Sequence, residues 1–176
     1  MLMINVVMVK FSARDLIWAK AAMGRLLIRA LSQKAGHRMA QKKRNSVDVG
    51  MDPQFRREAS LLLFEGEFSE ALIVNSRGTS VFATSPSAGA MRQGKFLSRE
   101  VMKTGKWSLK FSGSTWGVIW LTRRDIWISA LLLFEGQCVG GITTSASLMP
   151  IYEALRESKK VTPLSLIHRQ KKAKPH

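Results

Sequence analysis

Short apolar runs separated by turn signals constrain the fold of this chain more than any other feature. Six runs rich in β-branched, aromatic or leucine side chains are typical of strands: 61–64, 71–74, 81–83, 107–111, 116–121 and 126–134. Glycine-containing turns at 75–78, 112–114 and 140–141 punctuate them. Short connections favour antiparallel pairing. We therefore predict an α+β fold, in which an antiparallel sheet is packed by one or two helices, at 96–104 and 147–160.

The hexapeptide Leu-Leu-Leu-Phe-Glu-Gly occurs twice, at 61–66 and at 131–136. Each copy follows an Arg-Arg-acid triplet, at 56–58 and at 123–125. One interpretation is an internal duplication, and the other is coincidence between two buried strands that each end at a glycine turn. Two duplicated units of sheet and helix would resemble, in architecture alone, the Whirly and PUR folds that bind single strands.

Positive charge is concentrated at the two ends of the chain. The 176 residues include 28 Lys and Arg against 12 Asp and Glu, a formal net charge of +16. Residues 1–47 carry +9, residues 156–176 carry +6, and the segment between them carries only +1. Solubility is served by mixed signs, whereas nucleic acid and anionic membranes attract a segregated excess of this size.

The N-terminal segment has helical periodicity over 12–31, with apolar residues recurring at spacings of three and four. Its basic, amphipathic and acid-poor composition is typical of a mitochondrial transit peptide, although a helix retained in the fold is the alternative. We predict a basic arm or transit peptide (1–47), a single α+β domain (48–160) and a basic tail (161–176), located in the mitochondrial matrix. No 18-residue window lacks charge, so integral membrane insertion is not expected.

Basic residues of the middle segment lie close to tryptophans in the sequence, a combination found in platforms on which single-stranded nucleic acid stacks. Trp116 and Trp120 are the stacking candidates. We expect Trp107 to face the apolar interior, because Lys110 lies on the opposite face of the same strand. The predicted nucleic-acid-binding residues are Arg92, Lys95, Arg99, Lys103, Lys106, Lys110, Trp116, Trp120, Arg123, Arg124, Lys42, Lys43, Arg44, Arg169, Lys171, Lys172 and Lys174.

Motifs that carry chemistry are scarce. Residues 89–95 match the phosphate-loop pattern G-x-x-x-x-G-K, but Phe96 stands where Ser or Thr would hold magnesium, so we expect a grip on an RNA phosphate instead. His37, His168 and His176 lack the spacing of metal ligands. No nucleophile stands beside a candidate base. We predict no enzyme activity, no cofactor, no metal and no small-molecule substrate.

These patterns favour a non-catalytic RNA-binding protein, a structural component of a mitochondrial ribonucleoprotein such as a ribosome or an RNA-processing complex. Its expected partners are RNA phosphates and other proteins of the assembly. Two alternatives remain open. One is a peripheral membrane or protein-complex subunit with an interfacial N-terminal helix. The other is a single-stranded DNA-binding protein that uses its sheet.

Overall fold

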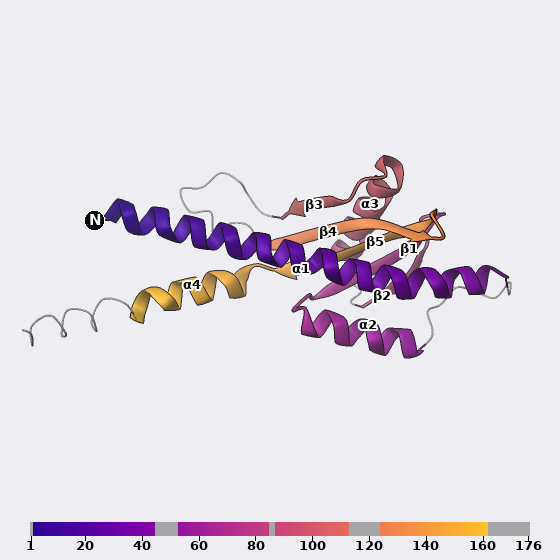
Figure 1. Cartoon of the computed structure of the whole chain (residues 1–176), viewed down its shortest axis with the longest axis horizontal. Coiled ribbons are helices and arrows are strands. Elements are labelled where there is room, and N and C mark those ends of the chain that lie inside the picture. Colours follow the sequence, from indigo (N-terminus) through magenta and orange to yellow (C-terminus); the bar gives the residue numbers. More distant parts are fainter. Residues whose placement is uncertain (1, 45–52, 85–86, 113–123, 162–176) are drawn as a thin grey trace, which may run out of the picture.

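A five-stranded antiparallel sheet with helices on both faces forms the centre of the molecule in the computed structural model (Figure 1). The structure describes residues 2–44, 53–84, 87–112 and 124–161. In chain order the elements are α1 (Leu2–Arg44), α2 (Pro53–Glu65), β1 (Glu70–Asn75), β2 (Ser80–Ala83), α3 (Ala88–Thr104), β3 (Ser108–Phe111), β4 (Asp125–Phe134), β5 (Gln137–Ser147) and α4 (Met149–Val161). The strands lie in the order β2-β1-β5-β4-β3. The predicted α+β class with an antiparallel sheet is confirmed.

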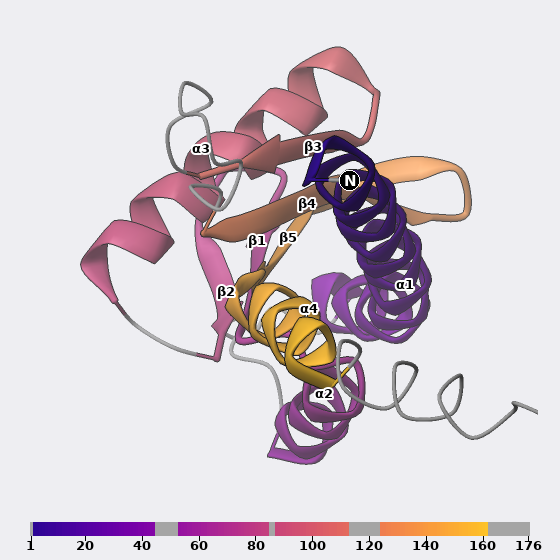
Figure 2. The same cartoon turned by 90° about the vertical axis from the view of Figure 1, so that its left-hand side faces the viewer.

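The helices divide between the two faces of the sheet. Figure 2 shows α1, α2 and α4 on one side, which we call the α1 face, and α3 alone on the other, which we call the α3 face. Because side chains alternate along a strand, Ile126 and Ile128 of β4 point to the α1 face, whereas Trp127 and Ser129 point to the α3 face. The two faces therefore differ in chemistry.

The α1 face carries the main hydrophobic core. Leu27, Leu31 and Ala35 of α1 recur every four residues and are buried against the sheet. Burial of each leucine contributes about 1.5–3 kcal/mol. A Cβ atom at Gly24 would lie 2.1 Å from Ile128 Cδ1, so a glycine there lets the helix approach the sheet closely. The helix that the sequence predicts over 12–31 is thus packed on the sheet as part of the fold.

The two copies of the repeated hexapeptide adopt different structures. Residues 61–66 form the last turn of α2 and the turn that follows, whereas 131–136 lie at the end of β4 and in its turn. The predicted strand at 61–64 is therefore wrong. The residues before the first copy make it helical, because Phe55, Ala59 and Leu63 form a buried stripe at helical spacing. The repeat does not mark two equivalent units, and the architectural resemblance to Whirly and PUR folds is not observed.

Most other predicted elements are found. The runs at 71–74, 81–83, 107–111 and 126–134 fall largely on β1, β2, β3 and β4, and the predicted helices fall on α3 and α4. In the turn between β1 and β2, Asn75 Oδ1 accepts hydrogen bonds from the backbone N–H groups of Arg77 and Thr79. The run at 116–121 lies outside the described residues.

The central strand β5 was not predicted, because Gly140 and Gly141 suggested a turn. Both glycines instead lie within β5, paired with Asn75 and Val74 of β1. A Cβ atom at position 140 would lie 2.0 Å from the carbonyl oxygen of Val74. Close approach of two strands, rather than a turn, therefore requires glycine here.

We predict that Gly140→Ala lowers the free energy of unfolding by about 1–3 kcal/mol, because the new methyl group would overlap backbone atoms of β1 that have little room to move. Gly89→Ala is the matched control. Gly89 lies in the first turn of α3 with nothing within 4 Å of a built Cβ atom, so alanine should add about 0.4–1 kcal/mol. Urea unfolding of both variants measures the difference. Equal stability of the two variants would contradict the packing described for β5.

Candidate functional site

A chain of buried hydroxyl groups holds α3 against the sheet. Thr143 Oγ1 on β5 donates to the carbonyl oxygen of Gly94 at 3.2 Å. Because a hydroxyl has one proton, Ser98 Oγ and Ser129 Oγ, each 2.8 Å from Thr143 Oγ1, must donate to it. A Cβ atom at Gly94 would lie 2.8 Å from Leu72 Cδ2. The middle of α3 is therefore fixed at short distance from β1 and β5.

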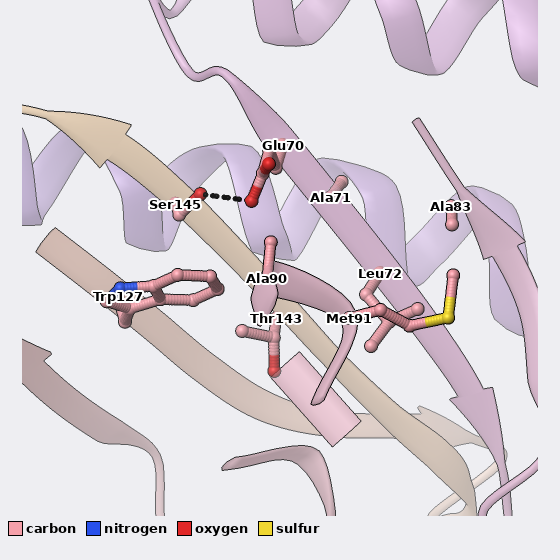
Figure 3. A pocket seen from close by; sticks show the side chains of 9 residues that line it. All are labelled: Glu70, Ala71, Leu72, Ala83, Ala90, Met91, Trp127, Thr143 and Ser145. Carbon is pink, nitrogen blue, oxygen red and sulfur yellow. Dashed lines mark hydrogen bonds between the residues drawn. The ribbon is translucent and has the colours of Figure 1, made fainter. Parts of the chain in front are cut away.

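A small pocket opens where the first turn of α3 passes over the sheet (Figure 3). Ser87 caps this end of the helix, since its Oγ accepts a hydrogen bond from the N–H of Ala90 at 3.3 Å. The pocket is lined by Glu70, Ala71, Leu72, Ala83, Ala90, Met91, Trp127, Thr143 and Ser145. Its cavity measures about 10 Å³, the space needed by a single water molecule or a group of similar size.

Three neighbouring strands place a carboxylate, a hydroxyl and an indole ring in one row of this pocket. Ser145 of β5 is registered opposite Glu70 of β1 on one side and Trp127 of β4 on the other. Ser145 Oγ donates to Glu70 Oε2 at 3.2 Å (Figure 3). Glu70 is the sole carboxylate among the lining residues. The arrangement offers hydrogen-bond acceptors beside an aromatic face, a combination suited to a cationic ammonium group.

The sequence reasoning missed these site residues. Glu70, Trp127 and Ser145 are not among the predicted site residues. A signal was present in residues 143–147, Thr-Thr-Ser-Ala-Ser, a run of hydroxyl side chains within a strand that is mostly buried. Polar side chains on an otherwise buried strand face another group that satisfies them.

The basic residues predicted to bind nucleic acid are partly assembled along α3. Arg92, Arg99 and Lys103 are exposed and lie within one arc of the helix, and Lys95 is half-buried nearby. Lys106 follows the helix and is exposed. The segment 89–95 lies within α3, where the N–H of Met91 already donates to the carbonyl oxygen of Ser87, so it forms no phosphate loop.

Other members of that predicted set are elsewhere or undescribed. Lys110 on β3 forms an ion pair with Glu100 of α3. Arg124 is exposed, and its backbone N–H donates to the carbonyl oxygen of Ser112. Lys42, Lys43 and Arg44 lie in the last turn of α1. Trp116, Trp120, Arg123, Arg169, Lys171, Lys172 and Lys174 lie outside the described residues.

The interior position predicted for Trp107 is wrong. Trp107 precedes β3, whose Leu109 and Phe111 point to the α1 face, but its side chain is 47% exposed. The guanidinium carbon of Arg25 lies 3.5 Å from the centre of its ring. The physical reason is that β3 is an edge strand, so a residue at its start lies at the rim of the core.

Several positive charges of α1 have partners inside the domain. Lys20, 8% exposed, donates to Glu67 Oε2 at 2.9 Å and to the carbonyl oxygen of Gly66 at 3.0 Å. Lys34 Nζ lies 2.8 Å from a carboxylate oxygen of Glu58. The hydrogen bonds from Lys20 and from Lys34 hold the pKa of Glu67 and of Glu58, respectively, below the usual glutamate range. These pairs fasten α1 to α2 and to the turn before β1.

Comparisons with known proteins relate the fold to sensory domains. No protein-family model matches the sequence, and the curated proteins contain no significant match. Among solved structures, the ligand-binding domain of the Pseudomonas aeruginosa amino-acid chemoreceptor PctC, in complex with GABA, superposes with a TM-score of 0.52 at 12% identity. The match covers 83% of this chain and 60% of that domain, so this chain spans less than two thirds of its length.

A second structure, the ligand-binding domain of the Pseudomonas fluorescens chemoreceptor CtaA in complex with L-serine, matches at 16% identity and a TM-score of 0.47. It covers 81% of this chain and 57% of that domain. At these identities the likeness concerns the fold alone.

The predicted function is wrong. The chain has the fold of an amino-acid chemoreceptor domain that binds a small molecule, which overturns an RNA-binding component of a mitochondrial ribonucleoprotein. The same finding overturns the DNA-binding alternative, the RNA partner, the exclusion of a small-molecule ligand and the mitochondrial matrix location. The membrane-subunit alternative stays a prediction. Charge misled the prediction because part of the excess on α1 is engaged within the domain, as the pairs of Lys20 and Lys34 demonstrate. The division of the chain into a basic arm, a domain and a basic tail, with boundaries at 47/48 and 160/161, stays a prediction. In the described part of the chain, no helix has the length and apolar character to cross a bilayer.

The ion pair of Lys20 and Glu67 predicts a pH dependence of stability. The pKa of Glu67 is lowered in the folded state, so the pair stabilises the fold above the unfolded glutamate pKa and this contribution is lost as the pH falls through the folded-state value. Glu67→Gln should therefore destabilise the protein at pH 7. The gap in melting temperature between the variant and the wild type should close as the pH falls from about 5 to about 3. Thermal melts across that range measure it, with the exposed Glu153→Gln as control. A gap that stays constant with pH would show that the pair contributes nothing.

Proposed function

We propose that this chain is a sensory-type domain that binds a small molecule bearing an ammonium group, such as an amino acid, in the pocket on the α3 face. The observation that carries the proposal is the row of Glu70, Ser145 and Trp127 across three strands in that pocket. In this proposal the domain binds its ligand without converting it.

The dimensions of the pocket support an ammonium group rather than a whole ligand as its occupant. A cavity of about 10 Å³ accepts one group the size of a water molecule, and an ammonium group has similar dimensions. Glu70 supplies the negative charge, Ser145 a further acceptor and Trp127 an aromatic face that attracts cations. The remainder of the ligand would extend through the open side of the pocket.

The N-terminal end of α3 forms another part of the pocket wall. Ala90 and Met91 belong to the first turn of α3, where the helix dipole places partial positive charge. The N–H groups of Ala90 and Met91 already donate to Ser87, so this end of the helix offers an anion only the field of its dipole. The PctC domain, solved with GABA, is a zwitterion-binding domain of the same fold, which supports this class of ligand.

The test is calorimetric titration of the full chain with single amino acids, γ-aminobutyrate and simple amines. Glu70→Gln preserves the size of the side chain and removes its charge, so it should weaken binding of the best ligand about ten- to hundredfold, the value of a charge-assisted hydrogen bond. Glu153→Gln, which removes an exposed carboxylate from α4, should bind as the wild type does.

Two results would contradict the proposal. One is the absence of heat or thermal stabilisation with every ammonium compound of the panel. The other is a Glu70→Gln variant that melts at the wild-type temperature and binds with unchanged affinity.

A further inference from the structure

A second, larger hollow lies on the opposite side of the sheet, between α1 and the edge formed by β3 and β4. It measures about 400 Å³, within the usual range of small-molecule sites. It is lined by Arg25, Ile28, Arg29, Ser32 and Gln33 of α1, by Trp107, and by Ile128, Ala130, Leu131 and Leu133 of β4. We call it the α1–β4 groove. It shares no lining residue with the pocket on the α3 face.

One side of the groove is apolar. Ile28 and Ile128 are buried at its base, and Leu133 of β4 is 50% exposed at its rim. Covering such a surface with a hydrocarbon or aromatic body is favourable, because apolar area is removed from water.

The other side of the groove carries uncompensated positive charge. Arg25 and Arg29 are four residues apart on α1 and therefore point in the same direction. Within the described part of the chain neither forms an ion pair with a carboxylate. Arg25 stacks on Trp107 at 3.5 Å, a contact that holds the guanidinium plane and leaves its edge N–H groups able to donate.

A third polar group in the groove lacks a hydrogen-bond partner. Ser32 Oγ, one turn beyond Arg29 on the same side of α1, is buried, and no partner for it exists among the described residues. A buried hydroxyl without a partner destabilises the fold, so a ligand atom that bonds to it would recover that loss.

From these observations we infer that the α1–β4 groove binds an amphipathic carboxylate, with its apolar body on Ile28, Ile128 and Leu133 and its carboxylate held by Arg25 and Arg29. Planar guanidinium groups bind carboxylates with two parallel hydrogen bonds, which accounts for the choice of anion. The ligand class differs from that of the α3-face pocket, where the protein supplies the negative charge.

The test compares decanoate with its uncharged analogue decanamide, titrated into the full chain below the concentration at which decanoate forms micelles. Decanoate should bind at least tenfold more tightly than decanamide, because the amide keeps the apolar body and loses the charge. Arg29→Gln should weaken decanoate binding about tenfold or more, and Ser32→Ala should weaken it several-fold without lowering the melting temperature. Arg77→Gln, which removes an exposed arginine from the turn between β1 and β2, is the matched control and should bind as the wild type does.

Tryptophan fluorescence gives an independent readout. Decanoate should change the emission of the wild type, and this change should disappear in Trp107→Phe, which retains an aromatic ring for Arg25. Three results would overturn the inference: no binding of decanoate, equal affinity for decanoate and decanamide, or an Arg29→Gln variant with wild-type affinity. Because the two sites share no residue, none of these results bears on the ligand of Glu70.

Discussion

The hydrogen bonds that converge on Thr143 Oγ1 set the distance between α3 and the sheet, and the α3-face pocket depends on that distance. Ser98 and Ser129 donate to this oxygen while its own proton is donated to the carbonyl group of Gly94, so each group is satisfied without water. A satisfied buried network of this kind holds a single geometry, because any shift leaves a polar group unpaired at a cost of about 1–3 kcal/mol. The first turn of α3, with Ala90 and Met91, is positioned by the same contacts.

The sheet separates the main hydrophobic core from the α3-face pocket. On the α1 face, side chains such as Leu31, Ile73 and Ile142 are fully buried in one apolar cluster, which α1 covers. On the α3 face, the same strands present Thr143, Ser145 and Glu70. Period-two alternation makes this possible, because adjacent residues of one strand serve opposite faces. A substitution that alters the α3-face pocket therefore need not touch the main core.

The sequence was sufficient to predict the class of fold where local chemistry decides the structure. Apolar runs predicted β3 and β4, and the Asn-Ser-Arg-Gly turn after β1 forms around Asn75 as its composition indicates. Prediction failed where contacts between residues far apart in the sequence decide the local structure. The hexapeptide at 61–66 follows a helical stripe and becomes helix, while its copy at 131–136 extends a strand. Gly140 looked like a turn because the carbonyl group that requires it, that of Val74, is 66 residues away in the chain.

The candidate site was beyond sequence reasoning for the same reason. Glu70, Trp127 and Ser145 come from three strands, and only the order β1-β5-β4 brings them into one row. The charge excess was visible, but the sequence does not reveal that Lys20 is buried beside Glu67, 47 residues away. The net charge of a sequence indicates which partners its surface could attract. Ion pairs within the fold reduce the charge that is available to such partners.

The most direct test of the account is an NMR titration of the ¹⁵N-labelled full chain with an equimolar mixture of amino acids. The account predicts that the backbone signals of Ala90, Met91 and Ser145 and the indole signal of Trp127 shift together, because these groups surround the α3-face pocket. Signals of Gly24 and Leu31 on the opposite face should stay in place. Unchanged signals for the four pocket groups at saturating amino acid would contradict the account.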